Sequence, residues 1–307
     1  MARDRPGSRP CWGGLGSTSH QAPIVPVMAF TIVDWNVNGF ALKGQVELLD
    51  RLDWDVALLQ EVTRDTWPRF RELGTAGGVA FDHLPPLVGD GPRYASAVIV
   101  RGDASLHEFR VLPDVPSPER AAIASVELGG RRASVCSWAA PPGVSWGKAG
   151  KGRQVVRFAA WLKARPGPVV VGIDRNAPKW ERLDQQDDEW WNEHEPTLYG
   201  PDRPHDLRDA FREQVDRDPE LKDAIAAERP DGPLAVTHRR RGTDCRYDAI
   251  YASPEFDVVR VDHLWDAATA AGSDHAAVVA TLTWAPVTQS GTSAAAYAAA
   301  MRVGGAR

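Results

Sequence analysis

Cysteine is scarce in this sequence, and its few copies form no recognisable pattern. The 307-residue chain has three cysteines, Cys11, Cys136 and Cys245, which are odd in number and far apart. Such spacing matches neither a disulfide framework nor a zinc site, so we expect a reducing compartment and a cytoplasmic location. A chain of this length can bury a sufficient core without such cross-links.

Long apolar runs and an excess of positive charge are also lacking. No stretch approaches the roughly 18 consecutive apolar residues needed to cross a bilayer, and no apolar run follows the N-terminal arginines as it would in a signal peptide. The net charge is −5, which argues against tight non-specific binding to nucleic acid. It does not exclude a nuclease, because a carboxylate-rich metal site itself lowers the net charge. We therefore expect a protein without a membrane segment, and a monomer.

The two ends of the chain differ from its middle. Residues 1–27 are rich in Pro, Gly and Ser, a composition that predicts a disordered extension, and Met28 is our preferred natural start. Residues 286–307 form an Ala-rich tail. Residues 28–285 are predicted to be one domain.

Strand and helix patterns alternate through residues 28–285. Apolar runs and alternation predict strands at residues 30–35, 56–59, 94–100, 121–128, 133–138, 169–171, 247–252, 256–264 and 276–284. Helical spacing of apolar residues predicts helices at residues 40–52, 153–163, 207–213 and 221–228. Helices between strands, together with meander-like pieces, favour an α/β sandwich with mixed sheets.

Polar clusters stand where several of these strands begin or end. Taken singly, each is explained by an ordinary turn, a solvated loop or an edge position. A buried carboxylate within a strand must, however, be paired, since desolvating it alone is costly. The clusters centre on Asn36, on Gln60-Glu61, on Gly172-Ile173-Asp174-Arg175-Asn176, on Arg246-Tyr247-Asp248 and on Ser273-Asp274-His275.

In this order and placement, the clusters resemble the endonuclease/exonuclease/phosphatase superfamily of DNase I-like proteins. The resemblance covers residues 28–284, and its most specific parts are Gln60-Glu61 after a buried strand and Ser273-Asp274-His275 near the C-terminus. It implies a four-layer α/β sandwich, in which two packed mixed sheets are flanked by helices and the clusters meet at one rim.

The resemblance also implies roles for the clustered residues. Asn36, Glu61 and Asp274 would form the metal region, for Mg²⁺ or alternatively Mn²⁺, because Mg²⁺ prefers one or two carboxylates plus waters. The catalytic residues would be Asp174, which activates water, Asn176, which contacts a phosphate oxygen, and His275, oriented by Asp248. We also assign Arg175, His238 and Arg239 to substrate binding.

One departure from the family pattern concerns the strand that ends near Cys136. The family usually has a His or a Tyr shortly before the Pro that follows this strand. Here the stretch contains Trp138 and Ala139 instead. A group that helps to bind the phosphate or protonate the leaving group is therefore missing.

The predicted function is metal-dependent hydrolysis of a phosphodiester, with nucleic acid as the preferred substrate. Two alternatives stay open. The same chemistry could act on a small phosphoester or a lipid headgroup, or the missing His could mark a catalytically weakened phosphate-binding module.

Overall fold

The computed structural model describes residues 28–39, 42–84, 92–165, 167–177, 181–183, 193–200 and 203–286. The predicted N-terminal extension, residues 1–27, and all but the first residue of the tail, residues 286–307, lie outside the described residues. Within the described part of the chain, no helix is long and apolar enough to span a bilayer.

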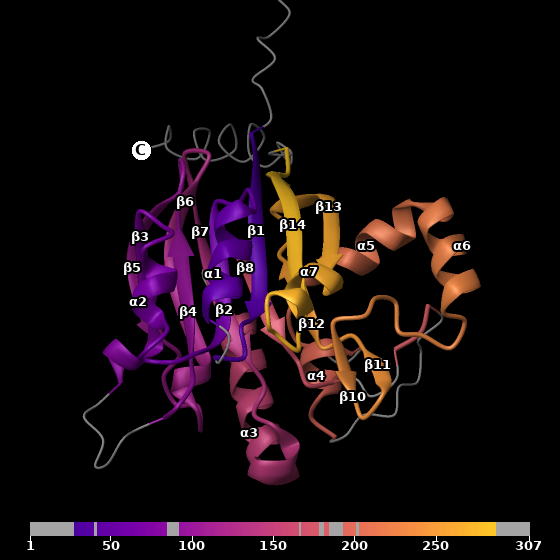
Figure 1. Cartoon of the computed structure of the whole chain (residues 1–307), viewed down its shortest axis with the longest axis horizontal. Coiled ribbons are helices and arrows are strands. Elements are labelled where there is room, and N and C mark those ends of the chain that lie inside the picture. Colours follow the sequence, from indigo (N-terminus) through magenta and orange to yellow (C-terminus); the bar gives the residue numbers. More distant parts are fainter. Residues whose placement is uncertain are drawn as a thin grey trace, which may run out of the picture.

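Two six-stranded sheets pack face to face (Figure 1). The first sheet contains, in spatial order, β13 (Phe256–Leu264), β14 (Ala277–Trp284), β1 (Ala29–Asn36), β2 (Val56–Val62), β4 (Ala95–Val100) and β3 (Ala76–Val79). The second sheet contains β5 (Ser105–Val111), β6 (Ala121–Leu128), β7 (Arg131–Ala139), β8 (Val169–Asp174), β12 (Asp248–Ala252) and β9 (Arg208–Asp209). A separate hairpin joins β10 (His238–Arg240) to β11 (Thr243–Cys245).

Helices cover the outer faces of both sheets. The first sheet carries α1 (Leu42–Arg51), α2 (Trp67–Arg71) and α7 (Trp265–Ala270), and the second carries α3 (Gly143–Ala164) and α4 (Pro196–Tyr199). Helix α5 (Ala210–Arg217) packs beside β12 and β13, and α6 (Pro219–Glu228) packs beside α5. Two short 3₁₀ helices are η1 (Ala80–His83) and η2 (Pro118–Arg120). The predicted four-layer α/β sandwich is thus confirmed.

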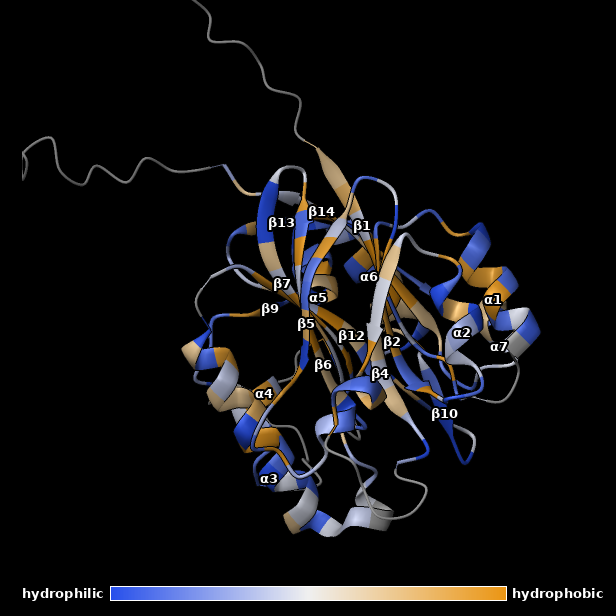
Figure 2. Ribbon diagram, turned by 90° about the vertical axis from the view of Figure 1, so that its left-hand side faces the viewer, coloured by the Kyte–Doolittle hydropathy of each residue, from blue (hydrophilic) through white to orange (hydrophobic). Residues whose placement is uncertain are grey.

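Alternation along the strands separates the core into layers. On β1, Ile32 faces the second sheet and Val33 faces the helices, because successive side chains of a strand point to opposite sides. Figure 2 shows hydrophobic residues concentrated along the strands, while α1 and α2 carry both hydrophobic and hydrophilic residues. Strand β2 is buried on both faces, which explains why residues 56–59 form a continuous apolar run.

The strand directions place the chemistry at one edge. Strands β1 and β2 are parallel, as are β7 and β8, whereas the other pairings within the two large sheets are antiparallel. The carboxyl ends of β1, β2, β7 and β8 lie at the lower edge of the sandwich in Figure 1. The polar clusters at strand ends therefore gather there.

The sequence prediction was wrong at the helix expected over residues 207–213. The structure has the short strand β9 first, and α5 begins only at Ala210. The Asp209 carboxylate accepts hydrogen bonds from the backbone N–H groups of Phe211 and Arg212, at 3.1 and 3.3 Å. This N-cap satisfies donors that the first helical turn leaves unpaired, and so sets where the helix starts.

Candidate active site

A buried carboxylate ties the two sheets together beneath the lower edge. Asp34, on β1, accepts a hydrogen bond from Gln60 Nε2 at 2.7 Å and another from the backbone N–H of Ile173 at 3.1 Å. A Cβ added at Gly172 would lie 2.2 Å from Asp34 Oδ1, so only glycine leaves room for this contact. Burial, above all, raises the pKa of Asp34 well above its usual value. The glycine of the Gly-Ile-Asp stretch therefore has a packing role.

Asp174 stands at the end of β8, and two asparagines hold it. Asn36 Nδ2 and Asn176 Nδ2 donate to Asp174 Oδ2 at 3.1 and 3.2 Å, and the backbone N–H of Asn176 donates to Oδ1 at 3.2 Å. Asn176 adopts the left-handed conformation, with φ of 47°, which is uncommon outside glycine and recurs at functional sites. The carboxylate is therefore fixed as a hydrogen-bond acceptor.

Glu61 occupies a β-bulge on β2. The register of β2 against β4 shifts between Leu59 and Val62, and Glu61 has φ of +56°. Bulges commonly re-aim a side chain beside an active site. Among the described residues, the Glu61 carboxylate has no hydrogen-bond or ion-pair partner. Burial, and then the charge of Asp174, raise the pKa of Glu61.

His275 and Asp248 form a buried pair. His275 Nδ1 lies 3.0 and 2.9 Å from the two carboxylate oxygens of Asp248, and Thr237 Oγ1 accepts the Asp248 backbone N–H at 3.0 Å. Burial disfavours the imidazolium, but the Asp248 carboxylate outweighs it and raises the pKa of His275 to about 10. The pair therefore holds a proton at neutral pH, with Nε2 as its second N–H donor.

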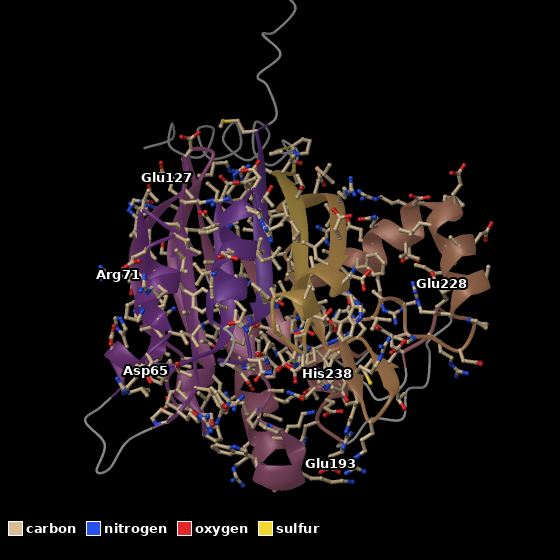
Figure 3. All side chains as sticks on the ribbon, in the orientation of Figure 1. Asp65, Arg71, Glu127, Glu193, Glu228 and His238 are labelled. Carbon is tan, nitrogen blue, oxygen red and sulfur yellow. The ribbon has the colours of Figure 1, made fainter. Side chains whose placement is uncertain are left out.

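The structure places His238 against this pair. Its ring stacks on His275 and on Tyr247, with centroid distances of 4.5 and 5.2 Å. Its Nδ1 donates to the Asp274 carbonyl at 3.0 Å, so Nε2 is the ring nitrogen left for other contacts. Figure 3 labels His238 near the lower edge of the sandwich, close to β10.

The side chains of two of the three predicted substrate-binding residues are engaged by other partners. Arg175 is buried and donates to Tyr251 Oη at 3.1 Å and to the Arg246 carbonyl at 2.9 Å. Its guanidinium thus belongs to a buried ion-pair cluster, because its charge there is balanced mainly by Glu181, 3.5 Å away. Arg239 is exposed and pairs with Asp244 across the hairpin at 2.6 Å.

Other residues near the site were not identified from the sequence. The Arg120 charge lowers the pKa of Glu61, opposing burial and Asp174, and Glu61 and Asp274 both raise the pKa of Tyr94, after burial. Both residues thus lie close enough to the site carboxylates to act on them electrostatically. Arg120 sits in a short 3₁₀ helix and Tyr94 just before a strand, and neither local pattern signals a site.

The position of the missing family His is now resolved. Trp138 is fully buried and stacks on Phe158, with ring centroids 4.8 Å apart. Ser137 points between the sheets, where its Oγ donates to the Leu59 carbonyl at 2.7 Å. Alternation puts Ala139 on the same side as Ser137, and its register partner is Asp174. Ala139 is therefore the residue that faces the site.

The carboxylates fit a hard divalent cation. In the described part of the chain, two groups bring ligand atoms within 4.8 Å of one another: His238, Asp274 and His275, and Asp174, Asp248 and His275. Glu61 belongs to neither group, yet it is unpaired, and Asp174 and Asp274 raise its pKa through their like charges. A cation near Glu61 would relieve that repulsion, and oxygen ligands are those that Mg²⁺ prefers.

Comparisons with known proteins agree with the fold. Residues 35–275 match the Endonuclease/Exonuclease/phosphatase family, while no curated protein sequence matches the chain significantly. A protein of this family from Bacteroides vulgatus has a TM-score of 0.59 at 14% identity, covering 84% of this chain and 100% of its own.

Two further solved structures are similar. D. rerio TDP2 complexed with a single-strand DNA product has a TM-score of 0.54 at 16% identity, covering 83% of this chain and 98% of its own. The human Nocturnin catalytic domain with a bound sulfate has a TM-score of 0.53 at 17% identity, covering 84% and 94%. At these identities the likeness is one of fold.

Proposed function

The chain belongs to the Endonuclease/Exonuclease/phosphatase family, and on that premise we propose that it hydrolyses phosphodiesters in nucleic acid with a divalent cation, Mg²⁺ or Mn²⁺. The observation that carries the proposal is the meeting, at one edge, of the held carboxylate Asp174, the hydrogen-bonded His275–Asp248 pair and Glu61, which has no partner among the described residues. Phosphodiester hydrolysis needs such a set, since negative charge must be offset while a water is oriented.

The metal region would consist of Glu61, Asn36 and Asp274. Glu61 supplies the charged ligand, and Asp274 acts through a water. Asn36 Oδ1 accepts the Asn38 backbone N–H at 2.9 Å, and its second lone pair is available to a cation. A bound divalent cation would offset the charge that develops on the phosphoryl oxygens.

Asp174, His275 and Asn176 have the remaining catalytic roles. Asp174 accepts a proton from the attacking water, because amide donors hold its two oxygens in a fixed orientation. His275 donates from Nε2 to a phosphate oxygen, and Asp248 keeps it protonated. Asn176 contacts another phosphate oxygen.

Nucleic acid is the favoured substrate because of the β10–β11 hairpin. Arg240 and Arg241 are exposed at its tip, two and three residues beyond His238. Two neighbouring guanidinium groups beside a phosphodiester site can bind the phosphates of a polyanionic backbone. D. rerio TDP2, which has a similar fold, was solved with a single-strand DNA product.

The test compares single-stranded DNA, plasmid nicking, bis(p-nitrophenyl) phosphate and a panel of phosphomonoesters, each with Mg²⁺ or chelator. We expect metal-dependent cleavage of the diesters. Turnover of the monoesters alone would favour a small phosphoester as substrate. Absence of turnover on every substrate, despite bound metal, would favour a phosphate-binding module.

A charge variant tests the choice of nucleic acid. The double variant Arg240→Gln/Arg241→Gln should raise KM for DNA and reduce its salt dependence, with little effect on bis(p-nitrophenyl) phosphate. The matched control is Arg71→Gln/Arg132→Gln. Figure 3 labels Arg71 far from His238, and Arg132 pairs in register with Glu127 at the opposite end. Equal effects of both double variants would contradict the hairpin's role.

A further inference from the structure

Lys151 and Glu195 form an ion pair that is almost completely buried. Lys151 Nζ lies 2.5 Å from Glu195 Oε1, and the two side chains are 1% and 0% exposed. Lys151 lies on α3, and Glu195 directly precedes α4. Lysine is almost never fully buried unless it is paired, as it is here.

The ammonium group of Lys151 also reaches the active site. Lys151 Nζ donates to the Asn176 carbonyl at 3.0 Å. Asn176 in turn holds Asp174 through both its side chain and its backbone N–H, and its side chain donates to the Ala140 carbonyl at 3.2 Å. The ion pair is therefore one hydrogen bond away from the residue that fixes the Asp174 carboxylate.

A buried ion pair contributes little net stability to a fold, because both charges must be desolvated. Removing two charges from water costs several kcal/mol per ion, and well-packed apolar residues often replace such a pair at no loss of stability. The additional hydrogen bond from Lys151 to the Asn176 carbonyl is one that an apolar pair could not supply. It acts on a residue in the left-handed conformation, with φ of 47°, which needs support from its surroundings.

The packing of α3 brings the pair into place. Gly152 follows Lys151, and a Cβ added there would lie 2.4 Å from His194 Cδ2. Glycine at this position therefore lets the segment before α4 approach α3 closely, which carries Glu195 to Lys151. Figure 3 labels Glu193 beside the lower part of α3, consistent with this approach.

We propose that Lys151, held by Glu195, is a positioning residue that fixes the Asn176 carbonyl and, through Asn176, the Asp174 carboxylate. The inference rests on the proposed function, because it takes Asn176 and Asp174 as catalytic groups. Residues one step removed from the chemistry that orient catalytic or ligating groups commonly contribute about 10- to 100-fold to activity.

The kinetic test uses Lys151→Met, which keeps the length of the side chain but removes its charge and donors. We expect kcat on bis(p-nitrophenyl) phosphate to fall about 10- to 100-fold, with KM nearly unchanged. The double variant Lys151→Met/Glu195→Met should recover the thermal stability of the wild type but not its kcat. Full kcat in either folded variant would overturn the proposal.

A double-mutant cycle separates positioning from a general structural effect. In an Asp174→Asn background, Lys151→Met should cause little further loss of kcat, because the carboxylate that it positions is already gone. The same fold-loss in both backgrounds would mean that Lys151 acts elsewhere.

Hydrogen exchange gives a readout that does not depend on activity. Amides of residues 174–177 should exchange faster in Lys151→Met than in the wild type, whereas the peptides of β6 should not change. If the wild type cleaves no phosphoester, the proposed function fails, and exchange at residues 174–177 still tests the contact. Unchanged exchange there would overturn it.

Discussion

The imidazole of His238 lies nearly flat against that of His275, with ring centroids 4.5 Å apart and an interplanar angle of 29°. His238 comes from the β10–β11 hairpin, whereas the family His would come from the end of β7, where this chain has Ala139. His238 Nδ1 donates to the Asp274 carbonyl, and we propose that its Nε2 takes over phosphate binding or leaving-group protonation, for which the ring must carry a second proton.

His238→Phe tests this substitution of roles. Phe preserves the stacking on His275 but removes the ring nitrogens, and one positioned acid–base group typically contributes about 10²–10⁴-fold. We expect kcat/KM on DNA to fall much more than kcat/KM on bis(p-nitrophenyl) phosphate, whose leaving group hardly needs protonation. Adding Ala139→His to this variant should restore part of the DNA activity. An equal fall on both substrates would assign His238 to packing.

Glu61→Gln should abolish metal-dependent turnover without unfolding the protein. The amide keeps the size of the carboxylate but removes the charge that a hard cation needs. Isothermal titration with Mn²⁺ should show weaker binding, while the melting temperature of the metal-free variant stays near or above that of the wild type, because the repulsion from Asp174 is gone. Glu228→Gln, on the distant helix α6 (Figure 3), is the control. Unchanged Mn²⁺ affinity would remove Glu61 from the metal region.

Asp174→Asn and His275→Ala should each lower kcat by several orders of magnitude, with a double variant little worse than either single one. Groups that act on one transition state lose their benefit together. The measurement is single-turnover cleavage of labelled DNA under saturating metal. Losses that simply add, or near-wild-type turnover in a single variant, would contradict the roles assigned to the two residues.

His205 should make the fold sensitive to mild acid. Its Nδ1 accepts the Leu207 backbone N–H at 3.3 Å, and its Nε2 donates to the Leu198 carbonyl at 3.1 Å, so the ring is neutral. Burial, partly opposed by the Leu198 hydrogen bond, lowers the pKa of His205 to about 4. Between pH 6.5 and 4 the unfolded state therefore binds more protons, and this contribution to stability is lost as the pH falls.

The corresponding measurement is urea unfolding of the wild type and of His205→Gln at several pH values. Each pH unit in this window changes the free energy of unfolding by about 1.4 kcal/mol for one such group, so the variant should lose less stability on acidification. Parallel pH profiles for the two proteins would show that His205 does not control this loss.

Much of the fold could be predicted because it is encoded locally. The continuous apolar run at residues 56–59 and the helical spacing at residues 153–163 identify a buried strand and a helix without reference to the rest of the chain. The four-layer sandwich followed from the order of these elements and the family resemblance. The start of α5 was not predicted correctly, because the Asp209 cap and the two-residue β9 carry no periodic signal.

The sequence by itself determined which polar residues lie at or next to the ends of strands: Asn36, Glu61, Asp174, Asp248 and His275. Only the tertiary structure decided which of them meet. Asn36 and Asp174 are 138 residues apart and come from different sheets, so their contact depends on how the sheets pack. The same packing places the Arg175 guanidinium in a buried ion-pair cluster and brings the Lys151 ammonium group to the Asn176 carbonyl. The direction of a long charged side chain depends on the partners that the fold brings close to it. Those partners lie far away in the sequence, so no local pattern predicts them.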